Sequence, residues 1–403
     1  MTQASNVKLK LTVPHLNFQH SGTLNELEVL GHIQTGIDFD WLNITLSFLM
    51  NNSPHFIAEQ FFTPVSELTP LGNGLINDTF WVKAESTQFV LQRINRTVFP
   101  KPLHIMDNLL MLNEHLEKNQ EKSVKLKIPA LLKTLNNDHF YFDEHCDCWR
   151  ALAFIENSES LDRLVDLGQA QQVGFALGHF HYLLSDLEPS SLHDTLPGFH
   201  IAPDYLRHYQ TILTITVLQS EPDSLYCADF IARNQHLTEN LETAKAQGLL
   251  TLRVIHGDPK LNNFLFDRVS KKIISLIDLD TIKPGLVHYD IGDCLRSCCH
   301  KPETNEFNMA LCEVILESYL SEAGAFFSAS DYDYLYTAIQ LLPFELGLRF
   351  YTDFLEGNRY FKVTDPKQNL NRALAQFRLC ESIIAQELAI KSLIKQLRQS
   401  FSG

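Results

Sequence analysis

The sequence has little positive charge, no long apolar run and no secretory signal, and each absence excludes a class of protein. Its 403 residues include 33 Lys and Arg against 48 Asp and Glu, which gives a formal net charge of −15. No basic block offsets this excess, which argues against a nucleic-acid partner. No apolar stretch approaches the roughly 18–20 residues that a membrane helix needs. The N-terminus lacks the basic start, apolar stretch and cleavage site of a signal peptide, so we expect a soluble cytoplasmic protein with no membrane partner.

The sequence also lacks the cysteine spacing of a zinc site, although it contains eight cysteines. Neither a C-x-x-C pair nor a C-x-x-C with histidines is present. Cys294, Cys298 and Cys299 cluster on one expected helix. We interpret this cluster as small buried hydrophobic residues and assign no chemistry to cysteine.

The pattern of hydrophobic residues divides the chain into three parts. Residues 1–54 combine scattered apolar residues with turn formers, and we interpret them as an N-terminal extension of unknown role. Residues 55–156 alternate short β-like segments with one helix after Pro102, which predicts a small antiparallel sheet. Residues 157–403 are mostly long helical patterns with a few short strands between them. This order predicts a two-lobed α+β architecture, with a β-rich first lobe and a larger helical second lobe. The oligomeric state stays open.

A glycine-rich loop lies between two of the β-like segments of the first lobe. A dinucleotide-binding fold would need a helix after such a loop, but residues 79–83 alternate as a strand. A strand, a glycine loop and a second strand fold over nucleotide phosphates in kinase-like proteins, where backbone N–H groups approach the ligand. The alternative is a plain hairpin turn. The candidate nucleotide contacts in this loop are Gly72, Asn73, Gly74 and Asn77.

A second motif, HGDPKLNN at residues 256–263, has the H-x-D-x-x-x-x-N spacing of a kinase-like catalytic loop. A short hairpin then leads to Asp278 and Asp280. Phosphoryl transfer needs a carboxylate that meets the acceptor hydroxyl, and Mg²⁺ on the phosphates needs hard oxygen ligands. We predict that Asp258 is the catalytic base, that Asn263 and Asp278 hold Mg²⁺, and that Asp280 is a possible further ligand. The alternative is a surface turn with coincidental polar residues.

The cations that would face the phosphates are less well defined by the sequence. Lys260 lies two residues after the base, where it could neutralise the transferring phosphoryl group or be a solvated loop lysine. Kinase-like proteins usually place a lysine on the third strand. Here that segment offers Gln92 or Arg93, and strand alternation puts the two on opposite faces, so only one can face the cleft.

The partner acid on the following helix could be Glu114 or Asp107, and the sequence leaves both open. The strand at 149–155 leads to Glu156, and we expect this segment to be the hinge whose backbone pairs with adenine. Side-chain identity at such a hinge carries no information.

The HGDPKLNN and IDLDT (277–281) motifs resemble those of the aminoglycoside phosphotransferase and choline kinase superfamily. Further blocks, spread over about residues 56–363, resemble the N-acetylhexosamine 1-kinases, which use ATP to phosphorylate the anomeric hydroxyl of N-acetylglucosamine and N-acetylgalactosamine. The resemblance implies a protein-kinase-like fold, an ATP and Mg²⁺ requirement and a small-molecule sugar substrate. The blocks are LGNGLINDTFWV (71–82), FVLQRINRTVFPKP (89–102), LPGFH (196–200), IDLDTIKPGLVHYDIGDCLR (277–296) and GLRFYTDFLEGNRYF (347–361).

The same resemblance implies that the segment at 347–361 supplies sugar contacts, which makes Arg349 and Tyr360 the candidates. An arginine fork donates to hydroxyl or acetamide oxygens, and a tyrosine ring stacks on the apolar face of a sugar. For Arg349 the alternative is an internal ion pair. Asp290 and Asp293 could accept from sugar hydroxyls, or they could cap and brace the next helix.

The sequence therefore predicts an ATP- and Mg²⁺-dependent sugar 1-kinase, with ATP under the glycine loop and the sugar in the helical lobe. One alternative is a kinase of another small alcohol, such as an amino alcohol, an aminoglycoside or a different sugar. A second alternative is a nucleotide-binding regulatory protein that has lost phosphoryl transfer. The retained Asp258, Asn263 and Asp278 argue against the second alternative.

Overall fold

The computed structural model describes residues 53–72, 74, 76–85, 87–118, 126–216 and 221–401, together with two short strands nearer the N-terminus. The chain divides into two compact units, residues 1–51 and 52–403. In the first unit, β1 (Thr12–Val13) pairs antiparallel with β2 (Leu16–Asn17). The rest of the first unit lies outside the described residues.

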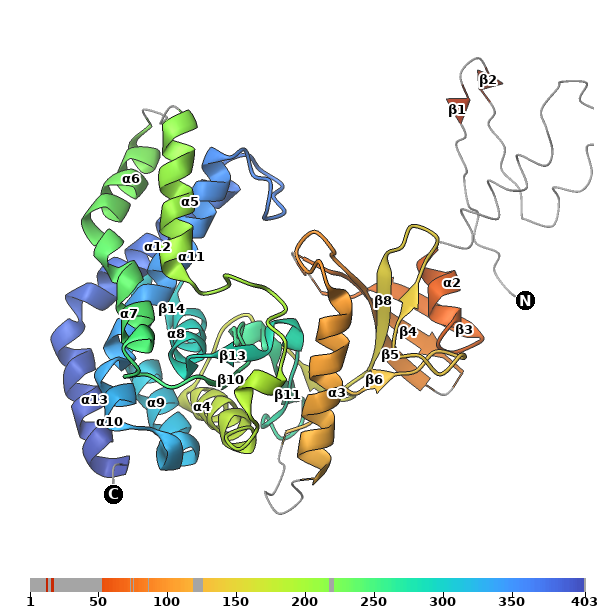
Figure 1. Ribbon diagram of the computed structural model, residues 1–403, viewed down its shortest axis with the longest axis horizontal. Coiled ribbons are helices and arrows are strands. Elements are labelled where there is room, and N and C mark those ends of the chain that lie inside the picture. The colour runs from red at the N-terminus through yellow and green to blue at the C-terminus, as the bar shows by residue number, and fades with distance from the viewer. Residues whose placement is uncertain are drawn as a thin grey trace, which may run out of the picture. The chain divides into compact units, whose positions relative to one another are not determined.

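The second unit begins with helix α2 (Pro54–Glu59) and an antiparallel sheet, shown in orange and yellow in Figure 1. The strand order is β3-β4-β5-β8-β6, and β7 also pairs with β8. The strands are β3 (Val65–Pro70), β4 (Asp78–Ala84), β5 (Thr87–Ile94), β6 (Leu131–Leu132), β7 (Tyr141–Phe142) and β8 (Cys148–Ala153).

The two faces of this sheet are buried by different helices. Alternation along β5 turns Phe89 and Leu91 toward one face, where they share a hydrophobic cluster with Ile57 of α2. Helix α3 (Pro102–Lys118) belongs to a second cluster, which includes its own Leu109 and Ile94 at the end of β5. The sheet therefore separates a small local core from the main core of the second unit.

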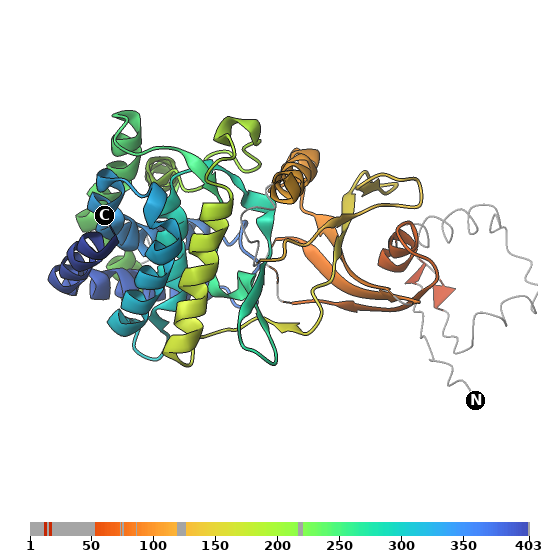
Figure 2. The same ribbon diagram turned by 90° about the horizontal axis from the view of Figure 1, so that it is seen from below.

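After β8 the chain continues through residues 154–157 into the second half of the unit. There β9 (Ser158–Glu159), β11 (Phe264–Asp267) and β12 (Ile273–Leu276) form an antiparallel sheet in the order β12-β11-β9. Strand β10 (Arg253–Ile255) pairs antiparallel with β13 (Lys283–Gly285). Both views show β10, β11 and β13 between the first sheet and the C-terminal helices (Figures 1 and 2).

Long helices make up most of the remaining chain and pack into one core. Helix α4 packs along α9, and α11 packs against α8 and α12. Cys294, Cys298 and Cys299 are buried in this core. None of the described helices is long and apolar enough to cross a membrane. The helices are α4 (Leu167–Leu183), α5 (Ala202–Ile215), α6 (Pro222–Asn234), α7 (Asn240–Ala246), α8 (Val287–Cys298), α9 (Met309–Ala323), α10 (Ala329–Asp333), α11 (Leu335–Leu355), α12 (Gln368–Ala385) and α13 (Glu387–Phe401).

A β-sheet region followed by a larger helical region is the two-lobed α+β architecture predicted from the sequence. The chain passes from the first region to the second after β8. Two ion pairs join the regions, one between Arg150 of β8 and Asp280 and one between Asp78 of β4 and Lys362.

Candidate active site

The loop at 256–263 connects β10 to a short 3-10 turn, Leu261–Asn263, and its backbone is held in place before any ligand binds. Gly257 has a φ of +88°, and a Cβ at this position would lie 2.6 Å from the Thr281 carbonyl oxygen. Only glycine can adopt this backbone conformation without displacing Thr281. The His256 ring adds a brace, because its Nε2 donates to the Ile277 carbonyl at 3.0 Å.

Asp290 on α8 fixes the start of the same loop. Its carboxylate accepts the backbone N–H of His256 at 2.7 Å and that of Gly257 at 2.8 Å. It also accepts from His181 Nε2 at 2.9 Å and is completely buried. Of the two roles considered for Asp290, this arrangement excludes the sugar contact, because the carboxylate is buried and its oxygens already have donors. The structure gives it the bracing role, with the catalytic loop as well as α8 held in place.

Four of the predicted catalytic and metal-binding side chains meet beside this loop. Lys260 Nζ lies 2.5 Å from Asp258 Oδ2 and 3.8 Å from Asp278 Oδ2. Asn263 Nδ2 donates to the Asp258 carbonyl at 2.7 Å. The side chains of Asp258 and Asp278 are 28% and 40% exposed, so both carboxylates can be reached from solvent. The group contains a base candidate and hard oxygen donors of the kind that Mg²⁺ prefers.

The charges of this group act on one another. Burial alone would raise the pKa of Asp258, but the neighbouring Lys260 ammonium, with His256 and Arg296, lowers it below its ordinary value. For Asp278, burial together with the Asp280 and Asp258 carboxylates raises the pKa in spite of Lys260. The pKa of Lys260 is raised by the two carboxylates although burial opposes this. Asp258 is therefore ionised at neutral pH, and a cation beside Asp278 would relieve its repulsion from the other acids.

The glycine loop is only partly described. Gly72 and Gly74 are exposed, while Asn73 lies outside the described residues. Asn77 donates from Nδ2 to Asp280 Oδ2 at 2.8 Å, and its Oδ1 accepts the Asn95 N–H at 3.0 Å. The Asn77 side-chain amide therefore anchors the end of the loop. The predicted contact of the Asn77 backbone with the nucleotide stays a prediction.

The side chain of Asp280 also binds protein groups. Its side chain forms a buried ion pair with Arg150 of β8, and its other oxygen accepts from Asn77. The residue is 2% exposed. Since both carboxylate oxygens already accept from protein donors, the structure gives Asp280 the role of joining the first sheet to the segment after β12. Each carboxylate oxygen has a second lone pair, so a further role of Asp280 as a metal ligand stays a prediction.

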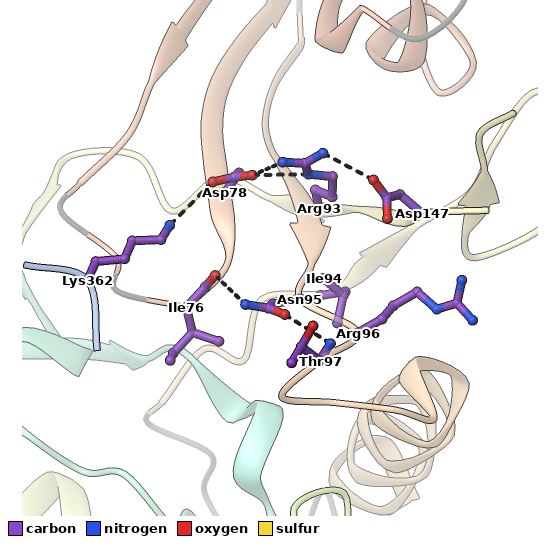
Figure 3. A pocket seen from close by; sticks show the side chains of 9 residues that line it. All are labelled: Ile76, Asp78, Arg93, Ile94, Asn95, Arg96, Thr97, Asp147 and Lys362. Carbon is purple, nitrogen blue, oxygen red and sulfur yellow. Dashed lines mark hydrogen bonds and ion pairs between the residues drawn. The ribbon is translucent and has the colours of Figure 1, made fainter. Parts of the chain in front are cut away.

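The structure separates Gln92 from Arg93 as strand alternation requires. Gln92 lies on the face that carries Arg150, and its Oε1 accepts from Arg150 Nη2 at 2.7 Å. Arg93 points to the other face, where it pairs with Asp78 and, at 3.1 Å, with Asp147 (Figure 3). Arg93 is thereby excluded as the third-strand contact to the phosphates.

A cavity of about 460 Å³ lies beside Arg93, and Figure 3 shows the side chains that line it. It is lined by the ends of β4 and β5, by Asp147 and by Lys362, whose Nζ lies 3.5 Å from Asp78 Oδ1. All of its charged side chains lie next to a charge of opposite sign or, for Arg96, a carbonyl oxygen. We assign no ligand to this cavity.

Neither of the two acids considered on α3 points toward β5. Asp107 lies 3.4 Å from His193, and Glu114 pairs with Lys118 at 2.6 Å on the exposed side of the helix. The buried polar residue of α3 is Asn108, which donates to the Ile282 carbonyl at 3.0 Å. Within the described part of α3, neither of the two acids considered from the sequence pairs with a cation on β5.

Arg349 on α11 lies among aromatic rings. Its guanidinium carbon is 5.0–6.0 Å from the ring centres of four residues, and within the described ranges no hydrogen bond or ion pair to it is present. This excludes the internal ion pair that we considered as the alternative. Although burial opposes it, Tyr205, Glu345 and also Asp258 raise the pKa of Arg349, so the guanidinium lies within electrostatic reach of Asp258. The four aromatic residues are Phe199, Tyr205, Tyr360 and Phe361.

The loop that carries Tyr360 is fixed by a residue that the sequence analysis missed. Asp353, at the end of α11, accepts the backbone N–H groups of Arg359 and Tyr360 at 2.8 Å and of Phe361 at 3.0 Å. It is 3% exposed. The sequence places Asp353 seven residues before Tyr360, but the sequence pattern does not distinguish an aspartate that caps a loop from one on the surface.

The sequence analysis also missed His200 and Glu345, which together join the catalytic loop to α11. His200 Nε2 donates to the Gly257 carbonyl at 2.7 Å, and its Nδ1 lies 2.9 Å from Glu345 Oε1. Burial lowers the pKa of His200, but Glu345, together with Asp293 and the Gly257 carbonyl, more than compensates and the pKa is raised. The residue before Asp258 is thus tied to the helix turn before Arg349.

The two remaining predicted residues lie at the edges of the site. Asp293 accepts from Arg296 Nε at 2.7 Å, and its buried Oδ2 has no hydrogen-bond partner among the described residues. It remains a candidate for a substrate hydroxyl. Glu156 is exposed between β8 and β9, where the chain passes from one sheet to the other.

A family model agrees with this arrangement. The phosphotransferase enzyme family matches residues 67–324, which is more than half of the chain. The chain belongs to this family, and it is a small-molecule phosphotransferase whose acceptor is an alcohol group. The match includes the glycine loop, the loop at 256–263 and Asp278.

Solved structures of low sequence identity share the fold. An aminoglycoside phosphotransferase from Alicyclobacillus acidocaldarius is 15% identical with a TM-score of 0.59, covering 87% of this chain and 96% of its own. A microcompartment-associated aminopropanol kinase is 16% identical with a TM-score of 0.61, covering 87% and 99%. A choline kinase from Cryptosporidium parvum is 15% identical with a TM-score of 0.53, covering 88% and 99%. These likenesses confirm the predicted protein-kinase-like fold.

Proposed function

We propose that this phosphotransferase uses ATP and Mg²⁺ to phosphorylate the anomeric hydroxyl of an N-acetylhexosamine. Family membership supports transfer to an alcohol, and the motif blocks described above support the sugar. The observation that carries the choice of acceptor is the Arg349 guanidinium, which lies among four aromatic rings in electrostatic reach of Asp258.

A fixed positive charge in the acceptor pocket disfavours a positively charged acceptor. Choline, aminopropanol and aminoglycosides, the substrates in the names of several structural neighbours, carry amines or quaternary nitrogens. Sites for such cations present aromatic faces or acids to them. Here the aromatic faces are already occupied by Arg349. A guanidinium fork with free donors suits neutral oxygen acceptors instead, such as the hydroxyls and acetamide oxygen of an N-acetylated sugar.

The remaining side chains then have separate roles. Asp258, ionised at neutral pH, orients the anomeric hydroxyl and takes its proton. Asn263 and Asp278 supply oxygen ligands for Mg²⁺, which neutralises charge on the phosphates when bound. Lys260 lies between Asp258 and Asp278, where its charge can stabilise the transferring group.

The test is ADP release from MgATP with a panel of acceptors. The panel contains N-acetylglucosamine, N-acetylgalactosamine, glucose, galactose, choline, homoserine and kanamycin. We expect turnover with N-acetylated hexosamines, and a reduction of about 10²–10⁴-fold in kcat for Asp258→Asn, as for loss of a general base. Asp333→Asn, an exposed acid paired with Arg398, is the matched control and should keep full activity.

Each other outcome would contradict part of the proposal. Turnover with choline, homoserine or kanamycin alone would reject the sugar pocket but keep the catalytic assignment. Normal turnover by Asp258→Asn would reject Asp258 as the base. Nucleotide binding without turnover on any acceptor would favour the regulatory alternative.

A further inference from the structure

Arg150 and Gln92 are neighbours across two strands of the first sheet. The register pairs Gln92 of β5 directly with Arg150 of β8, so both side chains lie on the same face. Gln92 Oε1 accepts from Arg150 Nε at 3.0 Å and from Nη2 at 2.7 Å. Gln92 Nε2 donates to Thr79 at 3.1 Å, which fixes the amide. The third strand therefore has a neutral amide where kinase-like proteins usually have a lysine, and the Arg150 guanidinium lies beside it.

Some N–H donors of the Arg150 guanidinium have no hydrogen-bond partner in the part of the chain that the structure describes. An arginine side chain has five N–H donors. The Nε donor bonds to Gln92, and the two Nη2 donors bond to Gln92 and Asp280. The Nη1 atom is buried and has no hydrogen-bond partner among the described residues. Arg150 itself is 1% exposed, so water does not readily solvate these two donors.

This guanidinium lies at the predicted nucleotide site. Arg150, Asp278 and Asp280 line one narrow cavity, with apolar walls from Leu109 and Leu152. Asp278 is the proposed Mg²⁺ ligand, and Asp280 joins Arg150 to Asn77 at the end of the glycine loop. Arg150, whose Nη1 donors have no partner within the described ranges, thus lines the same cavity as the proposed metal ligand.

We infer that Arg150 is the phosphate-binding cation of this enzyme, in place of a lysine on the third strand. Gln92 and Asp280 are positioning residues, because together they hold the fork and leave Nη1 free. Phosphate oxygens on the nucleotide are the acceptors that these two donors lack. The inference rests on the proposed use of MgATP. It adds a residue that no sequence motif marks.

The competing interpretation is that Arg150 only links the sheet to Asp280. A purely structural link would affect every nucleotide, and adenosine, to the same extent. A phosphate contact affects only ligands that carry the phosphates. The two interpretations are therefore distinguished by binding measurements, without any acceptor or turnover.

The experiment measures the Kd of Mg-ATP, Mg-ADP and adenosine by titration calorimetry for the full chain and for Arg150→Met, Arg150→Lys and the double variant Gln92→Lys/Arg150→Met. Unfolding in denaturant is recorded for each without ligand. Loss of a charge-assisted hydrogen bond weakens binding by about tenfold or more. Arg233→Met, which removes an exposed arginine from an i,i+4 pair on α6, is the matched control.

We expect Arg150→Met to weaken Mg-ATP and Mg-ADP by at least about tenfold while adenosine binds as in the wild type. Arg150→Lys should be intermediate, and the double variant should recover part of the affinity because the lysine returns to β5. The inference is overturned if Arg150→Met binds Mg-ATP normally, or if it loses ATP and adenosine equally. It is also overturned if Arg150→Met does not fold and Arg150→Lys, folded, loses affinity for Mg-ATP and adenosine equally. A wild-type protein that binds no Mg-ATP would instead reject the proposed function.

Discussion

The carboxylate of Asp290 accepts the backbone N–H of Gly257 at 2.8 Å, one residue before Asp258. The buried Asp290 on α8 thereby fixes the backbone next to Asp258, the proposed base. The same acid holds His256, so two consecutive peptide groups of the catalytic loop are fixed from one side chain.

We expect Asp290→Asn to reduce both stability and activity. The amide cannot accept at both oxygen positions, so one buried N–H loses its partner and the free energy of unfolding falls by about 1–3 kcal/mol. Because the loop shifts, kcat should fall by about tenfold or more with little change in the Kd of Mg-ATP. Denaturant unfolding and steady-state kinetics measure the two effects, and unchanged kcat in a destabilised protein would reduce Asp290 to a packing role.

Gly257 offers a test of the loop backbone with a matched glycine. Gly257 and Gly248 both have positive φ, +88° and +71°, but only at Gly257 would a Cβ meet other atoms within 4 Å. Gly248→Ala should cost about 1–2 kcal/mol of stability through backbone strain alone. Gly257→Ala should cost more and should also lower kcat, because Thr281 or the loop must move. Equal losses in the two variants, with full activity in both, would contradict this.

The stability of the protein should fall on mild acidification because of His288. This residue is completely buried on α8, and burial lowers its pKa below the ordinary value of 6.5. Near pH 6.5 the unfolded chain therefore binds a proton that the folded chain does not bind. The contribution of His288 to stability is full above pH 6.5 and is lost as the pH falls toward the folded-state pKa, by up to about 1.4 kcal/mol per pH unit.

His288→Gln removes this titration and serves as the comparison. Unfolding free energies between pH 7.5 and 5.5 should fall less steeply in the variant than in the wild type. His200, whose raised pKa acts in the opposite direction, is present in both proteins and cancels in the difference. Parallel pH profiles would show that His288 does not stay neutral in the folded chain.

Arg349→Met should change acceptor binding and not nucleotide binding. Without the guanidinium the pocket loses its charged donors, so KM for an N-acetylhexosamine should rise by about 10–100-fold, the range for hydrogen bonds to charged groups. Arg349→Lys keeps the charge without the fork and should recover only part of the loss. If KM for the sugar stayed constant while the Kd of Mg-ATP rose, Arg349 would belong to the nucleotide site.

The sequence was sufficient for the parts of the site that lie close together along the chain. Asp258, Lys260 and Asn263 share one loop, and Asp278 follows the next hairpin, so spacing alone predicted that they meet. Strand alternation also predicted that only one of Gln92 and Arg93 could face the cleft.

The missed residues depend on strand register and helix packing. Arg150 lies 58 residues after Gln92, and only the register of β5 against β8 places them side by side. One signal was available, since Arg150 is a charged residue in the middle of an otherwise apolar strand, CWRALA. From the sequence, Asp280 is a candidate metal ligand because it is an acid two residues after Asp278. Its ion pair with Arg150, which joins it to the first sheet, is known only from the structure.

The most direct test of the proposed function is the position of the phosphate on the product. Phosphorus NMR of the reaction with Mg-ATP and N-acetylglucosamine or N-acetylgalactosamine should show a sugar phosphate coupled to the anomeric proton, absent with Asp258→Asn. A phosphate at another hydroxyl, or a product formed only from a cationic alcohol, would contradict the proposed sugar 1-kinase.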